Sequence, residues 1–271
     1  MSKSIEQSTA VLIMAGGKGT RLSQRTFGRL PKPLVHLNKL PIIDYIIFNI
    51  INAGINKNNI YLMVNYQKEL LISYLQDQVN YIEITFPVEL GTWYAIKSSK
   101  PHLSNKYKNI LIIYGDMPFI KAATLQKLLE KHNSGHSILT FLTNKVSDPM
   151  LYDTARVIRD NSSKIIKVQE QKYCSPEELL IRERSIGPAI YKTSWIYENI
   201  SVQKYEQRNK RSELYITKLV EIAAAQNQPI QVVLSHDESE SYNINTLEQL
   251  QAAEGILEKQ NPLDNFTLQQ L

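Results

Sequence analysis

The stretch V-L-I-M-A-G-G-K-G-T-R-L, from Val11 to Leu22, joins an apolar run to a glycine-rich loop that carries two cations. Glycine lets backbone N–H groups come close to a ligand, and consecutive N–H groups in such a loop form a concave site for an anion. Lys18 and Arg21 add full positive charges to this loop. The stretch therefore predicts a buried strand followed by a polyphosphate-binding loop.

The loop matches neither the G-x-G-x-x-G dinucleotide fingerprint nor the G-x-x-x-x-G-K-[ST] P-loop. The alternative is a strand-to-helix turn in which the glycines serve only the geometry of the chain. Three glycines beside two cations favour phosphate binding over that alternative. The residues expected to contact the phosphates, besides Arg21, are Ala15, Gly16, Gly17, Lys18, Gly19 and Thr20.

Outward from this loop, apolar runs alternate with helical periodicity. Strands are expected at 10–14, 59–64, 81–85, 109–114 and 137–142, and helices at 41–53, 68–76, 92–98 and 122–132. This order predicts an α/β fold with a doubly wound, mostly parallel sheet, whose ligands bind beyond the carboxyl ends of the strands. After about residue 147 we expect a hairpin, a helix, a strand and a last helix, at 155–159 with 165–169, 214–226, 230–234 and from 246.

Composition narrows the class of protein. The chain has 271 residues, 43% of them hydrophobic, which suits one large or two small α/β domains. No apolar run reaches the roughly 18 residues that span a bilayer, and the single cysteine, Cys174, excludes an internal disulfide. Together with the polar N-terminus, these features predict a cytoplasmic protein without membrane contact.

The formal net charge of +5 leaves nucleic acid open as a partner. The lysines and arginines are scattered, however, and no basic stripe is interleaved with aromatic residues as in single-strand-binding proteins. A mild excess of positive charge also suits an enzyme whose substrates are phosphates. We therefore expect small phosphorylated substrates and no nucleic acid, while the oligomeric state stays open.

A second short motif, L-P-K-P-L, spans Leu30 to Leu34. Prolines on both sides restrict the backbone and predict an extended, fixed segment. A lysine held rigidly near a phosphate loop is a point charge for phosphate oxygens, and Lys32 is the candidate. Without the glycine loop, a surface lysine in a turn would be the default interpretation.

Together, A-G-G-K-G-T-R-L and the P-K-P-L that follows it resemble the signature of the sugar-1-phosphate nucleotidyltransferases. Further segments resemble this family along most of the chain: E-L-G-T at 89–92, Y-G-D-M-P at 114–118, V-Q-E-Q-K at 168–172, E-L-Y-I-T at 213–217 and N-I-N at 243–245. The branch they resemble most is the uridylyltransferase domain of the bifunctional N-acetylglucosamine-1-phosphate uridylyltransferases.

The resemblance implies a Rossmann-like, mixed and mostly parallel sheet with an inserted β-hairpin lid. It implies one nucleotidyltransferase domain at 1–261, with a nucleotide-binding half at 8–145 and a sugar-binding half at 146–261, followed by a tail at 262–271. The sequence holds no hexapeptide repeats like those of the acetyltransferase half of the bifunctional relatives, so acetyl transfer is not expected.

The resemblance also implies the chemistry. A sugar phosphate oxygen attacks the α-phosphorus of an NTP and pyrophosphate leaves, with Arg21 and Lys32 as catalytic residues on the phosphates. Asp116 and Asn245 would bind Mg²⁺, although helix capping is the alternative for both. Implied nucleotide contacts are Phe86, Glu89, Gly91, Thr92 and Gly115, and implied sugar contacts are Ala155, Glu170, Ser185 and Gly187. A solvent-facing strand position is the alternative for Glu170.

Several positions depart from the family pattern. Phe86 and Glu89 stand where the family has glutamines, and a phenyl ring cannot hydrogen bond to a uracil edge. Trp93 replaces a small residue, so it could crowd the nucleotide or stack on another group. The N-T-G and Y-G-R sugar segments read S-I-G at 185–187 and T-A-R at 154–156. These departures leave open another base, such as guanine or cytosine, another acceptor, or a catalytically silent nucleotide-binding regulator.

Overall fold

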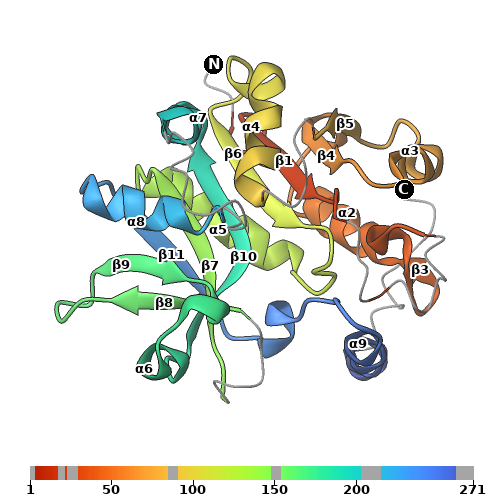
Figure 1. The fold of residues 1–271 in the computed structure, drawn as a ribbon. Helices are drawn as coiled ribbons and strands as arrows, with labels where there is room; N and C mark the ends of the chain where they lie inside the picture. The colour runs from red at the N-terminus through yellow and green to blue at the C-terminus, as the bar shows by residue number, and fades with distance from the viewer. Residues whose placement is uncertain are drawn as a thin grey trace.

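The computed structural model describes residues 4–17, 22, 30–84, 91–147, 154–202 and 215–260. Within these ranges a nine-stranded sheet forms the centre of the protein (Figure 1). Its main path runs in the spatial order β11 (Ile230–Ser235), β7 (Leu139–Lys145), β10 (Glu183–Lys192), β6 (Asn109–Tyr114), β1 (Thr9–Met14), β4 (Ile60–Val64) and β5 (Asn80–Glu83). A hairpin of β8 (Ala155–Arg159) and β9 (Ile165–Gln169) joins this path through β10.

The sheet is mixed and mostly parallel. β1 pairs in parallel with both β4 and β6, β4 pairs in parallel with β5, and β11 pairs in parallel with β7. β10 runs antiparallel between β6 and β7. The predicted fold class is therefore confirmed, and the hairpin has the strand bounds that the sequence predicted.

β10 is the strand of the central sheet that the sequence pattern missed. Gly187 and Pro188 interrupt its middle, and both residue types weaken strand predictions. The structure accommodates them in an irregularity, since the register with β7 shifts between Ser185 and Ala189 and Gly187 has a φ of +109°. Pairing along both edges of β10 thus overrides the local sequence signal.

Helices cover both faces of the sheet. Alternate residues of β1 point to opposite faces, and each set packs against the helices on its own side. Val11 and Ile13 belong to one buried cluster, together with side chains of α2 (Ile42–Asn52), α5 (Ala122–Ser134) and α9 (Leu247–Gln260). Ala10 and Leu12 belong to the other cluster, together with side chains of α4 (Thr92–Leu103), α7 (Thr193–Val202) and α8 (Lys218–Ala225). This is the doubly wound arrangement that the strand and helix order predicts.

The remaining elements are short. They are α3 (Lys68–Leu75), α6 (Pro176–Leu179), the β2 (His36–Leu37) and β3 (Leu40–Pro41) pair, and the 3₁₀ turns η1 (Lys32–Leu34), η2 (Lys57–Asn59), η4 (Gln171–Tyr173) and η5 (Glu238–Ser241). The helix predicted from residue 214 is seen from Lys218, and residue 214 lies outside the described ranges. Within those ranges, no helix combines the length and the apolar character that crossing a membrane requires.

Candidate active site

The candidate site begins where β1 and β6 end side by side. The two strands pair in parallel with Met14 opposite Tyr114, so the loops that follow them leave the same edge of the sheet. The N–H of Gly115 donates to Met14 O at 3.0 Å. A Cβ atom at position 115 would lie 3.0 Å from that same oxygen, so glycine permits this close approach. Asp116 is thereby held next to the start of the predicted phosphate loop.

Lys32 connects the two predicted metal ligands. Its Nζ donates to Asp116 Oδ2 at 2.5 Å and to Asn245 Oδ1 at 2.7 Å. The three residues come from distant parts of the chain, so the fold brings together three predictions made from separate motifs. Helix capping does not describe the Asp116 and Asn245 side chains, because both of these oxygens accept from the Lys32 ammonium.

The backbone around Lys32 differs from the extended segment that its two prolines predicted. Pro31 is extended, with φ −65° and ψ 148°, but Lys32 starts the 3₁₀ turn η1. Backbone hydrogen bonds from Leu34 to Pro31 O and from Val35 to Lys32 O close this turn. The prediction of an extended segment was wrong at Lys32 itself, because proline is also favourable at the start of a helical turn.

The Asp116 and Asn245 oxygens suit a hard divalent cation. Both oxygens already contact the positive charge of Lys32. The Lys32 and Asp116 side chains are only 14% and 20% exposed. Across the described residues, no group of three or more His, Cys, Asp and Glu side chains could hold a metal. Mg²⁺ commonly binds through one or two protein oxygens, with waters and substrate phosphates completing its shell. The donor pair therefore fits Mg²⁺ bound together with a nucleotide.

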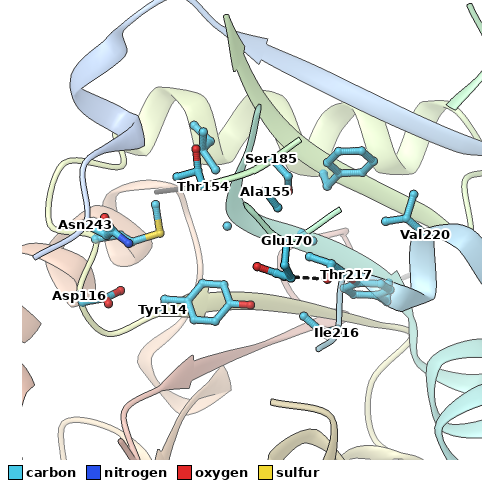
Figure 2. Close-up of a pocket in the computed structure, with 16 residues that line it drawn as sticks. Tyr114, Asp116, Thr154, Ala155, Glu170, Ser185, Ile216, Thr217, Val220 and Asn243 are labelled. Atoms are coloured by element: carbon cyan, nitrogen blue, oxygen red, sulfur yellow. Dashed lines mark hydrogen bonds between the residues drawn. The ribbon is translucent and has the colours of Figure 1, made fainter. Parts of the chain in front are cut away.

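A pocket opens beside Asp116, with a cavity volume of about 160 Å³ (Figure 2). All four predicted sugar contacts, Ala155, Glu170, Ser185 and Gly187, line it. Figure 2 shows Asp116 at one end of the pocket and Val220 at the other, with Glu170 between them. The structure thus places the predicted sugar contacts next to the predicted metal ligands, which is the arrangement that transfer to a sugar phosphate requires.

Glu170 follows β9 and is the only carboxylate among the described pocket residues besides Asp116. Its Oε1 accepts from the Thr217 hydroxyl at 2.7 Å, drawn as the dashed line in Figure 2. Tyr114 lies in the same lining, and burial, together with the charges of Glu170 and Asp116, raises the pKa of its hydroxyl above the usual value. The pocket therefore combines a carboxylate acceptor with neutral hydroxyl groups, and Glu170 does not occupy the solvent-facing position that was its alternative.

Other lining residues escaped the sequence analysis as site residues. Tyr114, Thr217 and Asn243 lie within the quoted motifs, so position in a motif was the signal that could have identified them. Phe141 and Tyr191 also line the pocket and had no such signal. Tyr191 belongs to the missed strand β10, and apolar periodicity does not say which end of a strand borders a cavity.

The predicted nucleotide contacts that are described lie around the same sheet edge. Ala15, Gly16 and Gly17 directly follow β1. A Cβ atom at Gly16 would lie 2.4 Å from Ile84 Cδ1, whereas one at Gly17 would meet nothing within 4 Å. Among the described residues, a side chain at position 17 would therefore meet open space, whereas one at position 16 would clash with Ile84.

Gly91 and Thr92 start α4, and Gly91 has a φ of +92° that glycine adopts readily. Thr92 Oγ1 accepts from the Ile216 N–H at 3.1 Å, which ties this segment to the wall of the pocket. Trp93 is 2% exposed and packs in the core cluster that contains α4, α7 and α8. Its bulk is therefore accommodated in the core. The predicted contacts Lys18, Gly19, Thr20, Arg21, Phe86 and Glu89 lie outside the described residues.

Known proteins resemble this chain over most of its length. A family model described as Nucleotidyl transferase matches residues 10–242. The bifunctional protein GlmU of Desulfotalea psychrophila is 26% identical over 92% of this chain and 70% of its own length. GlmU of Pelotomaculum thermopropionicum is 31% identical over 92% of this chain, and GlmU of Carboxydothermus hydrogenoformans is 30% identical over 88%. The chain spans about half the length of these last two relatives, 52% and 50%.

A solved structure has the same fold. It is a crystal structure assigned as a glucose-1-phosphate thymidylyltransferase from Bacillus anthracis, in complex with a sucrose. The TM-score is 0.72 at 19% sequence identity, and the match covers 92% of this chain and 94% of that one. At this identity, the likeness shows the fold of the chain and does not identify its substrates.

Proposed function

The chain belongs to the nucleotidyl transferase family, and we propose that it transfers a nucleotidyl group from an NTP to a sugar-1-phosphate. The products would be a nucleoside diphosphate sugar and pyrophosphate, as in UDP-N-acetylglucosamine synthesis. One observation carries the proposal. Asp116 and Asn245, predicted as metal ligands, converge on the Lys32 ammonium at 2.5 and 2.7 Å, beside a pocket lined by the predicted sugar contacts.

The reaction needs positioning and charge neutralisation, because an acceptor phosphate oxygen attacks the α-phosphorus without a covalent protein intermediate. Asp116 and Asn245 would hold Mg²⁺, which when bound supplies positive charge to the phosphate oxygens. Lys32 lies beside both ligands, so its ammonium would bind phosphate oxygens at the junction of nucleotide and acceptor. We assign the pyrophosphate to the loop of Ala15 to Thr20 and to Arg21.

The acceptor sugar would occupy the pocket beside Asp116. Its phosphate would then face Lys32, while its hydroxyls would meet the Glu170 carboxylate and the Thr217 and Tyr114 hydroxyls. A few carboxylate and hydroxyl groups within a largely apolar cavity are the polar groups that orient a small ligand. Phe141, Tyr191 and Val220 supply the apolar part of the lining.

The position of Trp93 bears on the alternative of a catalytically silent regulator. A tryptophan projecting toward the nucleotide was one reason to consider a blocked site. Its side chain packs in the core instead, which removes that reason and favours an active enzyme. Phe86 still favours a base other than uracil, because a phenyl ring cannot hydrogen bond to a uracil edge. The test therefore varies the NTP.

The test is Mg²⁺-dependent pyrophosphate release with each of the four common NTPs against a panel of sugar-1-phosphates. We expect turnover with one pair and its loss in Lys32→Met, which removes the charge but keeps a long side chain. Saturable NTP binding without turnover for any pair would refute the sugar-phosphate proposal. It would then favour another acceptor or a nucleotide sensor.

A further inference from the structure

Asn245 lies two residues before α9 (Leu247–Gln260), and the start of this helix fixes its backbone. We propose that Gln249 is a positioning residue that holds Asn245 in the geometry of a metal ligand. The inference rests on the proposed function, in which Asp116 and Asn245 bind a divalent cation. It concerns how the second of these ligands is kept in place.

Gln249 contacts Asn245 directly through a single side-chain oxygen. Its Oε1 accepts from the N–H of Asn245 at 2.7 Å and from the N–H of Thr246 at 3.1 Å. The preceding N–H, that of Ile244, donates to Asp116 O at 2.9 Å. Three consecutive N–H groups around Asn245 therefore have fixed partners, and one of these partners belongs to the other proposed ligand.

A helix cap explains only part of this arrangement. Thr246 Oγ1 accepts from the Gln249 N–H at 3.3 Å, and Gln249 Oε1 accepts from the Thr246 N–H, which together form a capping box at the start of α9. A capping box needs no bond to the residue before the cap. The shorter of the two bonds to Gln249 Oε1 nevertheless goes to Asn245, so this side chain restrains the ligand as well as the helix.

The loop that carries Asp116 is fixed against the same segment of chain. The N–H of Lys121 donates to Glu240 Oε1 at 2.8 Å, and Glu240 is only 1% exposed. Lys121 Nζ also pairs with Asp237 Oδ2 at 2.5 Å. With the Asp116 loop held at these points, Gln249 fixes the other end of the segment.

Two substitutions of Gln249 and one control separate positioning from helix stability. Gln249→Leu removes the acceptor at similar size, whereas Gln249→Glu keeps an acceptor oxygen in the same place. Thr246→Ala removes the reciprocal capping bond and leaves the bond to Asn245. Mn²⁺ affinity, measured from the EPR signal of free Mn²⁺, and thermal stability are compared across the full-length variants.

We expect Gln249→Leu to weaken Mn²⁺ binding about tenfold, as partners of metal ligands do when they are removed. In pyrophosphate release, the KM for Mg²⁺ should rise more than kcat falls. Gln249→Glu should bind Mn²⁺ like the wild type. Thr246→Ala should lose thermal stability comparable to Gln249→Leu and keep its Mn²⁺ affinity.

Unchanged Mn²⁺ affinity in Gln249→Leu would overturn the inference, and so would an equal loss of Mn²⁺ affinity in Gln249→Leu and Thr246→Ala. Asp116→Ala and Asn245→Ala separate this failure from that of the proposed function. If both leave Mn²⁺ binding unchanged, the proposed metal site is wrong and the role of Gln249 falls with it. If both weaken it while Gln249→Leu does not, the site stands and only the positioning role fails.

Discussion

The ammonium nitrogen of Lys32 lies 2.5 Å from the carboxylate oxygen Oδ2 of Asp116, 84 residues further along the chain. This contact places a protein cation on an oxygen that we assign to a metal. An ammonium and a divalent cation cannot share the same lone pairs at full strength, so Lys32 and the metal are expected to compete. Substrate phosphates resolve the competition, because they offer Lys32 another anion to bind.

Replacing Lys32 should have opposite effects on metal binding and on turnover. Lys32→Met should bind Mn²⁺ more tightly than the wild type without substrates, since the competing ammonium is gone. It should also lower kcat/KM about 10²–10³-fold, as the loss of a preorganised charge-stabilising group does. Lys68→Met removes an ammonium that pairs with Glu83 at 2.7 Å and does not line the pocket, and it should change neither property. Weaker Mn²⁺ binding in Lys32→Met would contradict the competition.

Glu170→Gln should raise the KM for the sugar-1-phosphate about tenfold or more, because hydrogen bonds to a charged group are stronger than those to a neutral one. The KM for the NTP should stay unchanged, since Glu170 lines the pocket that we assign to the acceptor. Steady-state kinetics with each substrate varied in turn would measure both. Glu183→Gln is the control, because the Glu183 carboxylate pairs with Arg159 and does not line this pocket. An equal rise in both KM values would argue against the assignment.

Gly187→Ala and Gly255→Ala should change stability in opposite directions. Gly187 has a φ of +109°, and a Cβ atom there would lie 2.7 Å from Met117 Sδ, so alanine should cost about 1–3 kcal/mol. Gly255 lies within α9 and a Cβ atom there meets nothing within 4 Å, so alanine should stabilise by about 0.5–1 kcal/mol. Urea unfolding measures both. A stable Gly187→Ala protein would mean that the irregularity in β10 relaxes easily.

Because His132 is buried, we expect the protein to lose stability in mild acid. Burial, and secondarily the charge of Lys192, lowers the pKa of this imidazole from 6.5 to about 4 in the folded protein. Between these values the unfolded chain binds the proton and the folded protein does not. The contribution of His132 is therefore fully present above about pH 6.5, decreases as the pH falls, and is lost near pH 4, in total about 3 kcal/mol.

The measurement is the free energy of unfolding from urea titrations between pH 7 and pH 4.5, compared with His132→Gln. The substituted protein should show a shallower decrease over this interval, because glutamine does not titrate. His132 bonds to Thr140 Oγ1 at 3.0 Å and to Asn109 Oδ1 at 3.3 Å, so the variant is expected to be less stable at pH 7. Parallel curves for the two proteins would assign the acid sensitivity to other groups.

The elements that the sequence predicted share a local cause. Residues 110–114 are an uninterrupted apolar run before a glycine, and the hairpin at 155–159 and 165–169 surrounds a turn of Asp, Asn and Ser residues. β10 needed information from elsewhere, because Gly187 and Pro188 are tolerated only through pairing with β6 and β7. Local patterns could not supply that pairing.

The site was predictable to the extent that its residues lie in motifs. Lys32, Asp116 and Asn245 were assigned from separate segments, and the structure brings their side chains into contact. The direct bonds between them were not predictable, since no motif encodes a distance between side chains far apart in the chain. Trp93 shows the opposite case. Its position next to Gly91 and Thr92 suggested contact with the nucleotide, but its side chain packs in the core.

The antiparallel strand β10 sets a constraint on how this protein is made. It lies between β6 and β7, although the chain completes both of those strands some 40 residues before it reaches β10. During synthesis the first 145 residues therefore emerge with three strand edges, one of β6 and both of β7, that β10 and β11 cover only later. Uncovered edges recruit strands from other chains. The nascent protein is consequently expected to depend on chaperones until β10 and β11 leave the ribosome, and a fragment ending near residue 145 should aggregate.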